Sequence, residues 1–337
     1  MKSISLSKLL TDYLSEFLPY RAELSSNTIS SYCDAFKLLL RFCRDNLKMS
    51  IEKISLTDID DTLVYSFLNW LEKERNCSNS TINQRLHAIH SFVRYAQCES
   101  PENLLTFKKV LNIPARRQTQ PIVSYINEND MRKVLQNPDT SNIFGRRDLT
   151  LLSVMYDTGA RVSEIVNLTV RDVRLETPAK IKLFGKGRKY RDVPILPRTV
   201  AMLESYLKEH RLITADKLDY PLFFNRKRQK FTRAGVAYIL SKNSSQLTTM
   251  NNTHITPHVL RHTKAMHLLQ AGVSIIYIKD ILGHVDISTT EVYARADLEM
   301  KRKALEKLSE ISPSTPPEWN TNTDLLTWLE NFGKRKL

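Results

Sequence analysis

The 337-residue sequence predicts a mainly α-helical protein with a small β-sheet, in which an all-helical domain precedes a mixed α/β domain. Two observations predict this division. No glycine occurs before Gly145, so the first part of the chain has few residues that break helices. The clearest β pattern lies after that point, in residues 180–196, KIKLFGKGRKYRDVPIL, where two short strands flank a Gly-Lys-Gly turn.

The first domain, residues 1–111, has apolar residues at intervals of three and four, as one buried helix face requires. This spacing predicts helices in the ranges 7–17, 29–43, 59–71 and 82–96. The expected N-caps of two of them are Ser26 or Asn27, and Ser78 or Asn79. We therefore expect a bundle of four or five helices.

The second domain, residues 125–310, follows a linker at 112–124, NIPARRQTQPIVS, which is basic, proline-containing and without periodicity. Helical patterns in this domain cover the ranges 127–136, 146–158, 199–210, 232–242 and 256–270. The C-terminal tail, 311–337, reads as a proline-rich spacer followed by a short amphipathic helix at 325–332.

The charge distribution favours a polyanionic partner. The chain carries 50 Lys and Arg against 36 Asp and Glu, a formal net charge of +14. Residues 1–110 hold 14 basic and 13 acidic side chains, so nearly all of the excess, +13, lies after residue 110. Such a confined basic excess is typical of proteins that bind nucleic acid, and charge that serves solubility alone is the alternative.

The composition argues against membrane and secreted proteins. No apolar run approaches the ~18 residues that a membrane span needs, and the N-terminus, MKSISLSKLL, lacks the apolar core of a signal peptide. The four cysteines all lie in the first hundred residues without metal-ligand spacing, as expected for reduced thiols. We expect a cytoplasmic protein without membrane association.

Five of the eight histidines fall between residues 254 and 284, which raises the question of a metal site. His258 and His262 are spaced i,i+4 and so share one helix face. A zinc protease would also need a glutamate next to the first histidine, and Val259 stands there instead. No Cys or Asp follows within the next turn. We therefore expect neither a metal nor another cofactor.

A site for phosphoryl transfer fits the same segment better. His258 and Arg261 lie one helical turn apart and can converge on one anion, while Gly283 frees the backbone for His284 to turn inward. Upstream, Arg161 follows a glycine at a helix start, and Lys186 lies at the hairpin tip. Two arginines, a lysine, two imidazoles and the phenol of the downstream tyrosine suit negative charge that develops on a phosphate.

These motifs together resemble the tyrosine recombinase/phage integrase family. The stretches that carry the resemblance, over about 125–310, are YDTGARVSEIVNL, the hairpin lysine, HVLRHTKAMHLL and ILGHVDISTTEVY. Carried over position by position, the family's active-site residues correspond to Arg161, Lys186, His258, Arg261, His284 and the nucleophile Tyr293, with Glu164 as supporting acid. The first hundred residues resemble the family's SAM-like core-binding domain. No arm-binding domain precedes it, so the resemblance is to Xer-like or mobile-element enzymes.

The resemblance implies a site-specific recombinase that forms a C-shaped clamp around double-stranded DNA. It would cut and rejoin DNA through a 3′-phosphotyrosine, without metal or ATP, as a tetramer on two sites in the bacterial cytoplasm. The residues expected to contact DNA are Arg85, Arg188, Arg233 and Lys242. A relaxing type IB-like topoisomerase and a catalytically inactive DNA-binding accessory protein are the alternatives.

The resemblance leaves three further points open. Integration, excision, transposition and chromosome-dimer resolution would use the same active site. Related recombinases pass a C-terminal helix to the neighbouring subunit. The tail of this chain either docks in that way or folds back on its own domain.

Overall fold

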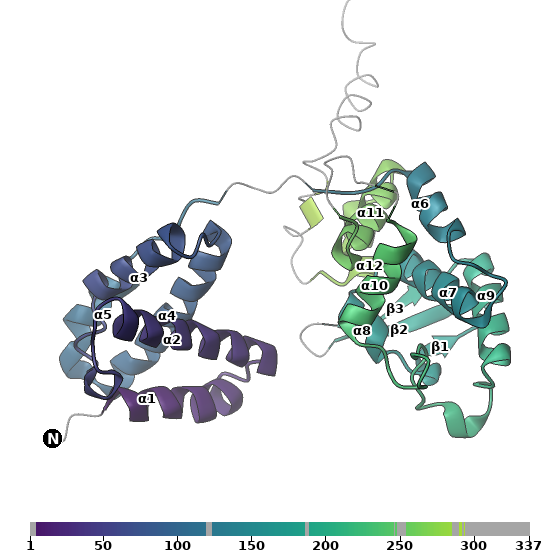
Figure 1. Cartoon of the computed structure of the whole chain (residues 1–337). Helices are drawn as coiled ribbons and strands as arrows, with labels where there is room; N and C mark the ends of the chain where they lie inside the picture. The colour runs from purple at the N-terminus through teal and green to yellow at the C-terminus, as the bar shows by residue number, and fades with distance from the viewer. Residues whose placement is uncertain are drawn as a thin grey trace, which may run out of the picture. The chain divides into compact units, whose positions relative to one another are not determined.

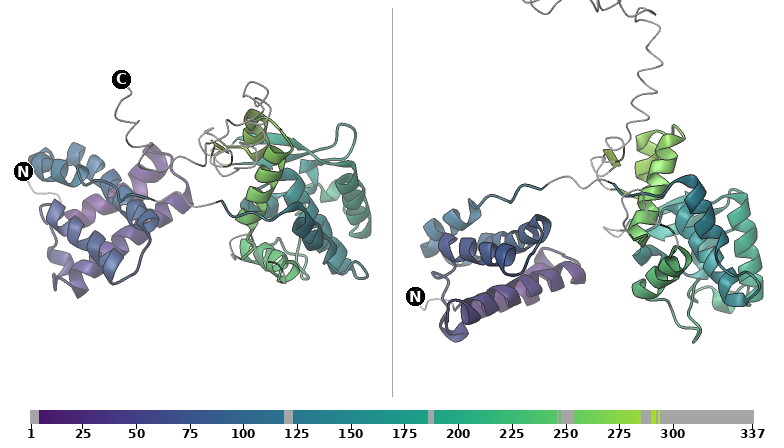
Figure 2. Two further views of the ribbon diagram at one scale, coloured as in Figure 1. Left: turned by 90° about the horizontal axis from the view of Figure 1, so that it is seen from above. Right: turned by 45° about the horizontal axis from the view of Figure 1, so that its top comes forward.

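A computed structural model describes residues 5–118, 123–185, 189–245, 247, 254–284, 290, 291 and 293 (Figure 1). The chain divides into two compact units, Met1–Pro121 and Ile122–Leu337, each with its own hydrophobic core. Figures 1 and 2 show the first unit as helices alone and the second as helices packed around a small sheet, so the predicted fold class is confirmed. In the described part of the chain, no helix is long and apolar enough to cross a membrane.

Helices make up the first unit. Their bounds are α1 Leu6–Asp12, a π-helix Tyr13–Arg21, α2 Ser26–Asp45, α3 Asp61–Lys73, α4 Asn79–Glu99 and α5 Leu104–Leu111. Pro19 lies inside the π-helix. In the core, Tyr13 and Phe36 each pack edge-on against Phe92, with ring centroids 5.3 Å apart in both pairs. Edge-on aromatic packing of this kind joins the N-terminal segment to α2 and α4.

One expected N-cap is wrong and the other is confirmed. Ser25, not Ser26 or Asn27, caps α2, because its extended backbone places its hydroxyl where it accepts from the backbone N–H of Thr28. Ser78 caps α4 in the same way. Periodicity locates a helix face well, but it does not fix the residue at which the backbone turns into the helix.

The start of the predicted linker lies on α4. The side chain of Asn83 donates to the backbone oxygen of Arg116 at 2.8 Å and accepts from its backbone N–H at 2.7 Å. Asn79 donates to the backbone oxygen of Arg117 at 2.8 Å. Two asparagines on one helix therefore hold the extended chain where it leaves the first unit.

The second unit combines helices with a three-stranded antiparallel sheet of order β1-β2-β3. Its helices are α6 Glu128–Gln136, α7 Ile143–Thr158, α8 Val162–Asn167, α9 Pro197–Glu209, α10 Arg233–Asn243, α11 Pro257–Gln270 and α12 Ile275–Leu282. Its strands are β1 Val173–Arg174, β2 Lys180–Phe184 and β3 Tyr190–Pro194. The predicted hairpin pairs Phe184 with Tyr190. Helix α7 packs against both α9 and α11, and α12 lies against β3.

Several expectations lie outside the described residues. They are Lys186 and Arg188 at the hairpin tip, residues 119–122 of the linker, and the tail at 311–337.

Candidate active site

The centre of the second unit is built where α7 and α12 end. Gly159 ends α7 with a left-handed backbone (φ +57°), and Gly283 ends α12 in the same way (φ +66°). A Cβ at residue 159 would lie 2.6 Å from Cδ2 of Leu282, closer than packed carbon atoms approach. Glycine at this position therefore lets the two helix ends meet.

Arg161 lies two residues after Gly159 and is the N-cap of α8. Its backbone N–H donates to Oε2 of Glu164 at 2.8 Å, and its guanidinium donates to Oε1 at 2.9 Å. The Arg161 side chain is 32% exposed, whereas that of Glu164 is 2% exposed. The buried carboxylate thus fixes the Arg161 side chain, whose Nη2 also donates to the backbone oxygen of Gly283 at 3.4 Å.

Arg261, on α11, is almost fully buried and holds both helix ends together. Its guanidinium donates to the backbone oxygen of Gly159 at 2.8 Å and to that of Leu282 at 2.7 Å. Burial, with the nearby charge of Arg161, lowers the pKa of Arg261 to about 10. The side chain therefore remains a cation at neutral pH.

Arg191, on β3, is a site residue that the sequence analysis missed. It donates to both carboxylate oxygens of Glu164, at 2.9 and 2.8 Å, and to the backbone oxygen of Ile281 at 2.9 Å. It thereby joins the hairpin to α8 and to the end of α12. The alternation of strand residues could have revealed Arg191, because it shares the inward face of β3 with buried Val193. A cation on the inward face of a sheet needs a buried anionic partner.

Glu164 is held as an anion by these two arginines. Burial alone would raise the pKa of its carboxyl, but the hydrogen bonds and charge of Arg191, with a smaller contribution from Arg161, hold that pKa below its ordinary value. The stabilisation that this carboxylate provides is therefore present above the ordinary glutamate pKa and is lost as pH falls through the lowered one.

Arg191→Met is expected to destabilise the second unit by about 3–5 kcal/mol at pH 7, because it leaves a buried carboxylate with one of its two cations removed. Urea unfolding at pH 7 measures this cost. The cost should shrink as pH falls through the lowered pKa of Glu164, where the carboxylate takes up a proton.

Arg171→Met is the matched control, since Arg171 pairs with Asp219 at 2.8 Å on the surface, where both side chains are more than half exposed. It should cost about 1 kcal/mol or less. A loss at Arg191 no larger than this, or one that is independent of pH, would contradict the bridging role.

The histidines approach the same point from α11 and from the end of α12. His284 follows Gly283, and its Nδ1 lies 2.8 Å from Oγ1 of Thr290. Burial, followed by the charges of Arg261 and Arg161, lowers the pKa of His284 to about 4. Burial and the same two arginines also lower the pKa of His258. Both imidazoles are therefore neutral at pH 7 in the free protein.

Tyr293 is 2% exposed and packs among apolar residues of α11 and α12. Its hydroxyl lies 2.7 Å from Nδ1 of His262, and its ring stacks on His284 with centroids 6.3 Å apart. Burial raises the pKa of the Tyr293 phenol, and the charges of Arg261 and Arg161 partly offset this rise.

His262 is the second site residue that the sequence does not reveal, because its i,i+4 spacing from His258 indicates a shared helix face but not its hydrogen bond to Tyr293. The rings of His258 and His262 lie on one face of α11, as their spacing predicts, with their centroids 4.2 Å apart. The His262 ring also contacts the phenol ring of Tyr293. Among the described residues, no three His, Cys, Asp or Glu side chains gather as a metal site requires.

A cleft of about 380 Å³ opens beside these groups, between the hairpin and the end of α12. Arg191 and His284 line it together with Lys189 and Lys279, and Asp280 is the one acidic residue in its lining. The cleft is therefore mainly basic, and it is suited to an anionic ligand beside His284, whose ring stacks on that of Tyr293.

Three of the expected DNA-contacting residues lie in the described part of the chain, two on α10 and one on α4. Arg233 begins α10 and is exposed, and Lys242 lies near the other end of that helix. Arg85, on α4 of the first unit, is half-buried and donates to the backbone oxygen of Ser31 at 3.0 Å.

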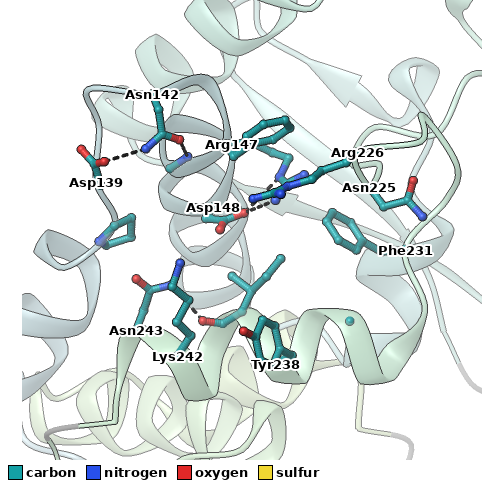
Figure 3. Close-up of a pocket in the computed structure, with 15 residues that line it drawn as sticks. Asp139, Asn142, Arg147, Asp148, Asn225, Arg226, Phe231, Tyr238, Lys242 and Asn243 are labelled. Carbon is teal, nitrogen blue, oxygen red and sulfur yellow. Dashed lines mark hydrogen bonds and ion pairs between the residues drawn. The ribbon is translucent and has the colours of Figure 1, made fainter.

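Lys242 also lines a larger cleft of about 580 Å³ between α7 and α10 (Figure 3). On its far wall, Arg147 lies between the rings of Phe144 and Phe231, donates to the backbone oxygen of Phe224 and pairs with Asp148 at 2.7 Å. These contacts fix the loop before α10 to α7, so they set the position of the helix that carries Arg233.

Comparison with known proteins identifies the family. The phage integrase family profile matches residues 124–300, and the phage integrase N-terminal SAM-like domain profile matches residues 10–99. A Sinorhizobium fredii protein named as an integrase/recombinase, y4rC, is 36% identical over 336 residues, which cover 98% of this chain and 99% of the relative. The tyrosine recombinase XerD of Oceanobacillus iheyensis is 32% identical over 280 residues, 82% of this chain and 90% of the relative.

Solved structures show the same fold. The XerH site-specific recombinase bound to a palindromic difH substrate superposes with a TM-score of 0.67 at 22% identity, over 92% of this chain and 98% of that one. The sequence matches extend over both units, and they include the segments that supply the two arginines, the histidines and the tyrosine. The chain therefore belongs to the phage integrase family of site-specific tyrosine recombinases.

Proposed function

We propose that this protein cuts and rejoins double-stranded DNA at specific sites through a covalent 3′-phosphotyrosine formed by Tyr293. One observation carries this proposal: a buried tyrosine hydroxyl is held within a group of cations and imidazoles that come from α8, α11 and the end of α12. The XerH structure with this fold is a complex with a difH substrate, which supports DNA as the ligand.

Arg161 and Arg261 are the proposed electrophilic groups. Negative charge builds on the non-bridging phosphate oxygens as the phenol attacks phosphorus, and a guanidinium offers forked donors that match those oxygens. Arg161 is held by Glu164 and Arg261 by two backbone oxygens, so both cations are in place before DNA binds. Groups fixed in advance in this way stabilise a transition state without reorganisation.

Lys186 is the proposed general acid for the leaving 5′-oxygen. His258 and His284 are proposed to hold phosphate oxygens or to assist proton movement next to them. The product keeps the energy of the phosphodiester bond in the phosphotyrosine. The reaction therefore needs neither ATP nor a metal ion in this scheme.

DNA recognition is proposed to use both units as a clamp. Arg233 and Lys242 on α10, and Arg188 at the hairpin, would contact DNA from the second unit, and Arg85 from the first. Phosphate contact is the default role for such residues, because half to two-thirds of protein–DNA hydrogen bonds go to phosphates and sugars. The confined excess of +13 after residue 110 supports this arrangement.

Recombination between two supplied sites tests the proposed function. A binding site is first selected from a randomised duplex library with the Tyr293→Phe protein, and two direct copies are placed in a plasmid. The wild-type protein, in excess EDTA and without nucleotide, should delete the DNA between the copies. Relaxation without deletion would indicate a topoisomerase, and binding without any covalent adduct would indicate an inactive accessory protein.

The protein is proposed to act as a tetramer on two sites, with the tail at 311–337 docking on the neighbouring subunit. Leu325, Trp328, Leu329 and Phe332 follow one face at helical spacing, and a helix this short needs a partner surface. The bacterial cytoplasm is its proposed location. Integration, excision, transposition and dimer resolution are all compatible with this chemistry.

Deleting residues 311–337 is expected to preserve binding to a single site while lowering recombination by about tenfold or more, because subunits that no longer share an element synapse less well. Light scattering of the truncated protein on DNA measures the assembly. Deleting only 333–337, which leaves the apolar face intact, is the control. Normal tetramers with full recombination in the longer deletion would refute docking in trans.

A further inference from the structure

The hydroxyl of Tyr293 has a specific neighbour. Its oxygen lies 2.7 Å from Nδ1 of His262, within the range of an ordinary hydrogen bond, and the two rings meet edge-on with centroids 5.4 Å apart. Because Tyr293 is 2% exposed, bulk water has little access to this hydroxyl. A proton that leaves the phenol therefore needs an acceptor within the protein.

The imidazoles of His284 and His258 make other contacts. Nδ1 of His284 is bonded to Oγ1 of Thr290 at 2.8 Å, and its ring stacks on that of Tyr293, so neither of these contacts engages the hydroxyl. His258 meets His262 with ring centroids 4.2 Å apart, one helical turn earlier on α11. Of the described histidines, His262 is the one whose ring nitrogen is hydrogen-bonded to the hydroxyl of Tyr293.

We propose that His262 is the proton acceptor for Tyr293 during DNA cleavage. As the phenol oxygen forms its bond to phosphorus, its proton moves to Nδ1 of His262. The bond from phosphorus to the 5′-oxygen breaks, and its electron pair leaves with that oxygen, which takes a proton from the general acid. Rejoining reverses these transfers, so His262 returns the proton to the phenol. This inference rests on the proposed function and adds a catalytic residue to it.

The acceptor must be the neutral imidazole with its proton on Nε2, because only then does Nδ1 have a free lone pair. Burial, followed by the charges of His258 and Arg261, lowers the pKa of His262 to about 4, so the ring is neutral in the free protein at pH 7. The groups facing it are His258 and Arg261 on α11 and the phenol of Tyr293.

DNA binding makes this histidine a stronger base. The cation of Arg261 opposes a positive charge on His262, and a bound phosphate places a negative charge against that cation. A phosphate therefore raises the pKa of His262 toward the working pH, where proton transfer is most effective. Proton acceptance is in this way coupled to the presence of substrate.

Single-turnover cleavage of a nicked duplex that carries the selected site tests the proposal. His262→Ala removes the acceptor, whereas His262→Asn keeps an oxygen that bonds to the phenol but does not take its proton. His210→Asn is the matched control, because His210 is a buried histidine that packs on Tyr206 and Phe224. Denaturing gels measure the adduct between pH 6 and 9.

Both His262 variants are expected to cleave about 10²–10⁴-fold more slowly than wild type at pH 7, the usual contribution of a positioned base. Their rates should rise about tenfold per pH unit, because hydroxide replaces the lost base, while the wild-type rate stays nearly flat. Added imidazole should partly restore His262→Ala, and His210→Asn should match wild type.

Two results would overturn the proposal. Cleavage by His262→Asn within about threefold of wild type would show that the histidine only positions the phenol. Slow variants with a flat pH profile would show a structural defect. If wild type itself forms no adduct, the proposed function fails and this inference fails with it. An active wild type with equally active variants refutes the inference alone.

Discussion

Tyr293→Phe is expected to abolish covalent attachment to DNA and to leave DNA binding unchanged. The change removes one hydroxyl, whose neighbour is Nδ1 of His262, and leaves every basic side chain in place. The lost hydrogen bond should cost about 1 kcal/mol of stability, too little to unfold the domain. A denaturing gel of the selected duplex detects the adduct, and a mobility shift measures binding.

Tyr277→Phe is the matched control for this prediction. Tyr277 lies on α12 and is 66% exposed, so the loss of its hydroxyl should leave adduct formation at the wild-type level. A Tyr293→Phe protein that still gives a denaturant-resistant protein–DNA band would show that another residue is the nucleophile.

Arg261→Lys is expected to lower the cleavage rate by about 10²–10³-fold, the usual cost of losing one positioned donor to a developing oxyanion. Lysine keeps the positive charge but has no planar fork with which to reach Gly159, Leu282 and a phosphate together. Affinity for DNA should change little, because most phosphate contacts lie elsewhere. Single-turnover cleavage and a mobility shift separate the two effects.

Arg261→Lys also tests whether Arg261 stabilises the fold by holding the ends of α7 and α12 together. Arg261→Lys should lower the free energy of unfolding by about 1–3 kcal/mol, because at least one buried carbonyl loses its donor. Arg132→Lys on α6, where the side chain is 71% exposed, should change neither cleavage nor stability. A rate for Arg261→Lys within threefold of wild type would remove the guanidinium from the proposed transition state.

Much of the fold followed from local patterns. The predicted segment 82–96 falls within α4, and the segment 256–270 matches α11 and its N-cap. The two strands of the expected hairpin pair as β2 and β3. The extent of short elements escaped detection, although a helix start was expected at Arg161. Helix α8 has six residues and strand β1 has two, so neither reaches two full repeats of its period, and tertiary packing holds them in place.

Site residues that belong to a local sequence motif were predicted. Site residues whose role depends on a contact with a distant part of the chain were missed. Arg161, Arg261 and His284 stand beside glycines or on a strongly patterned helix, and the structure places all three around Gly283 and Leu282. Arg191 and His262 gain their roles from partners 27 and 31 residues away in sequence. Local spacing does not encode such long-range pairs.

The central claim is that Tyr293 becomes joined to the 3′ end of cleaved DNA. Mass spectrometry of the wild-type protein, trapped on a nicked duplex and digested with protease and nuclease, tests this most directly. We expect one peptide that contains Tyr293 and carries nucleotides through a 3′-phosphodiester. A linkage to another residue, a linkage to a 5′ end, or cleaved DNA without any nucleotide-bearing peptide would contradict the claim.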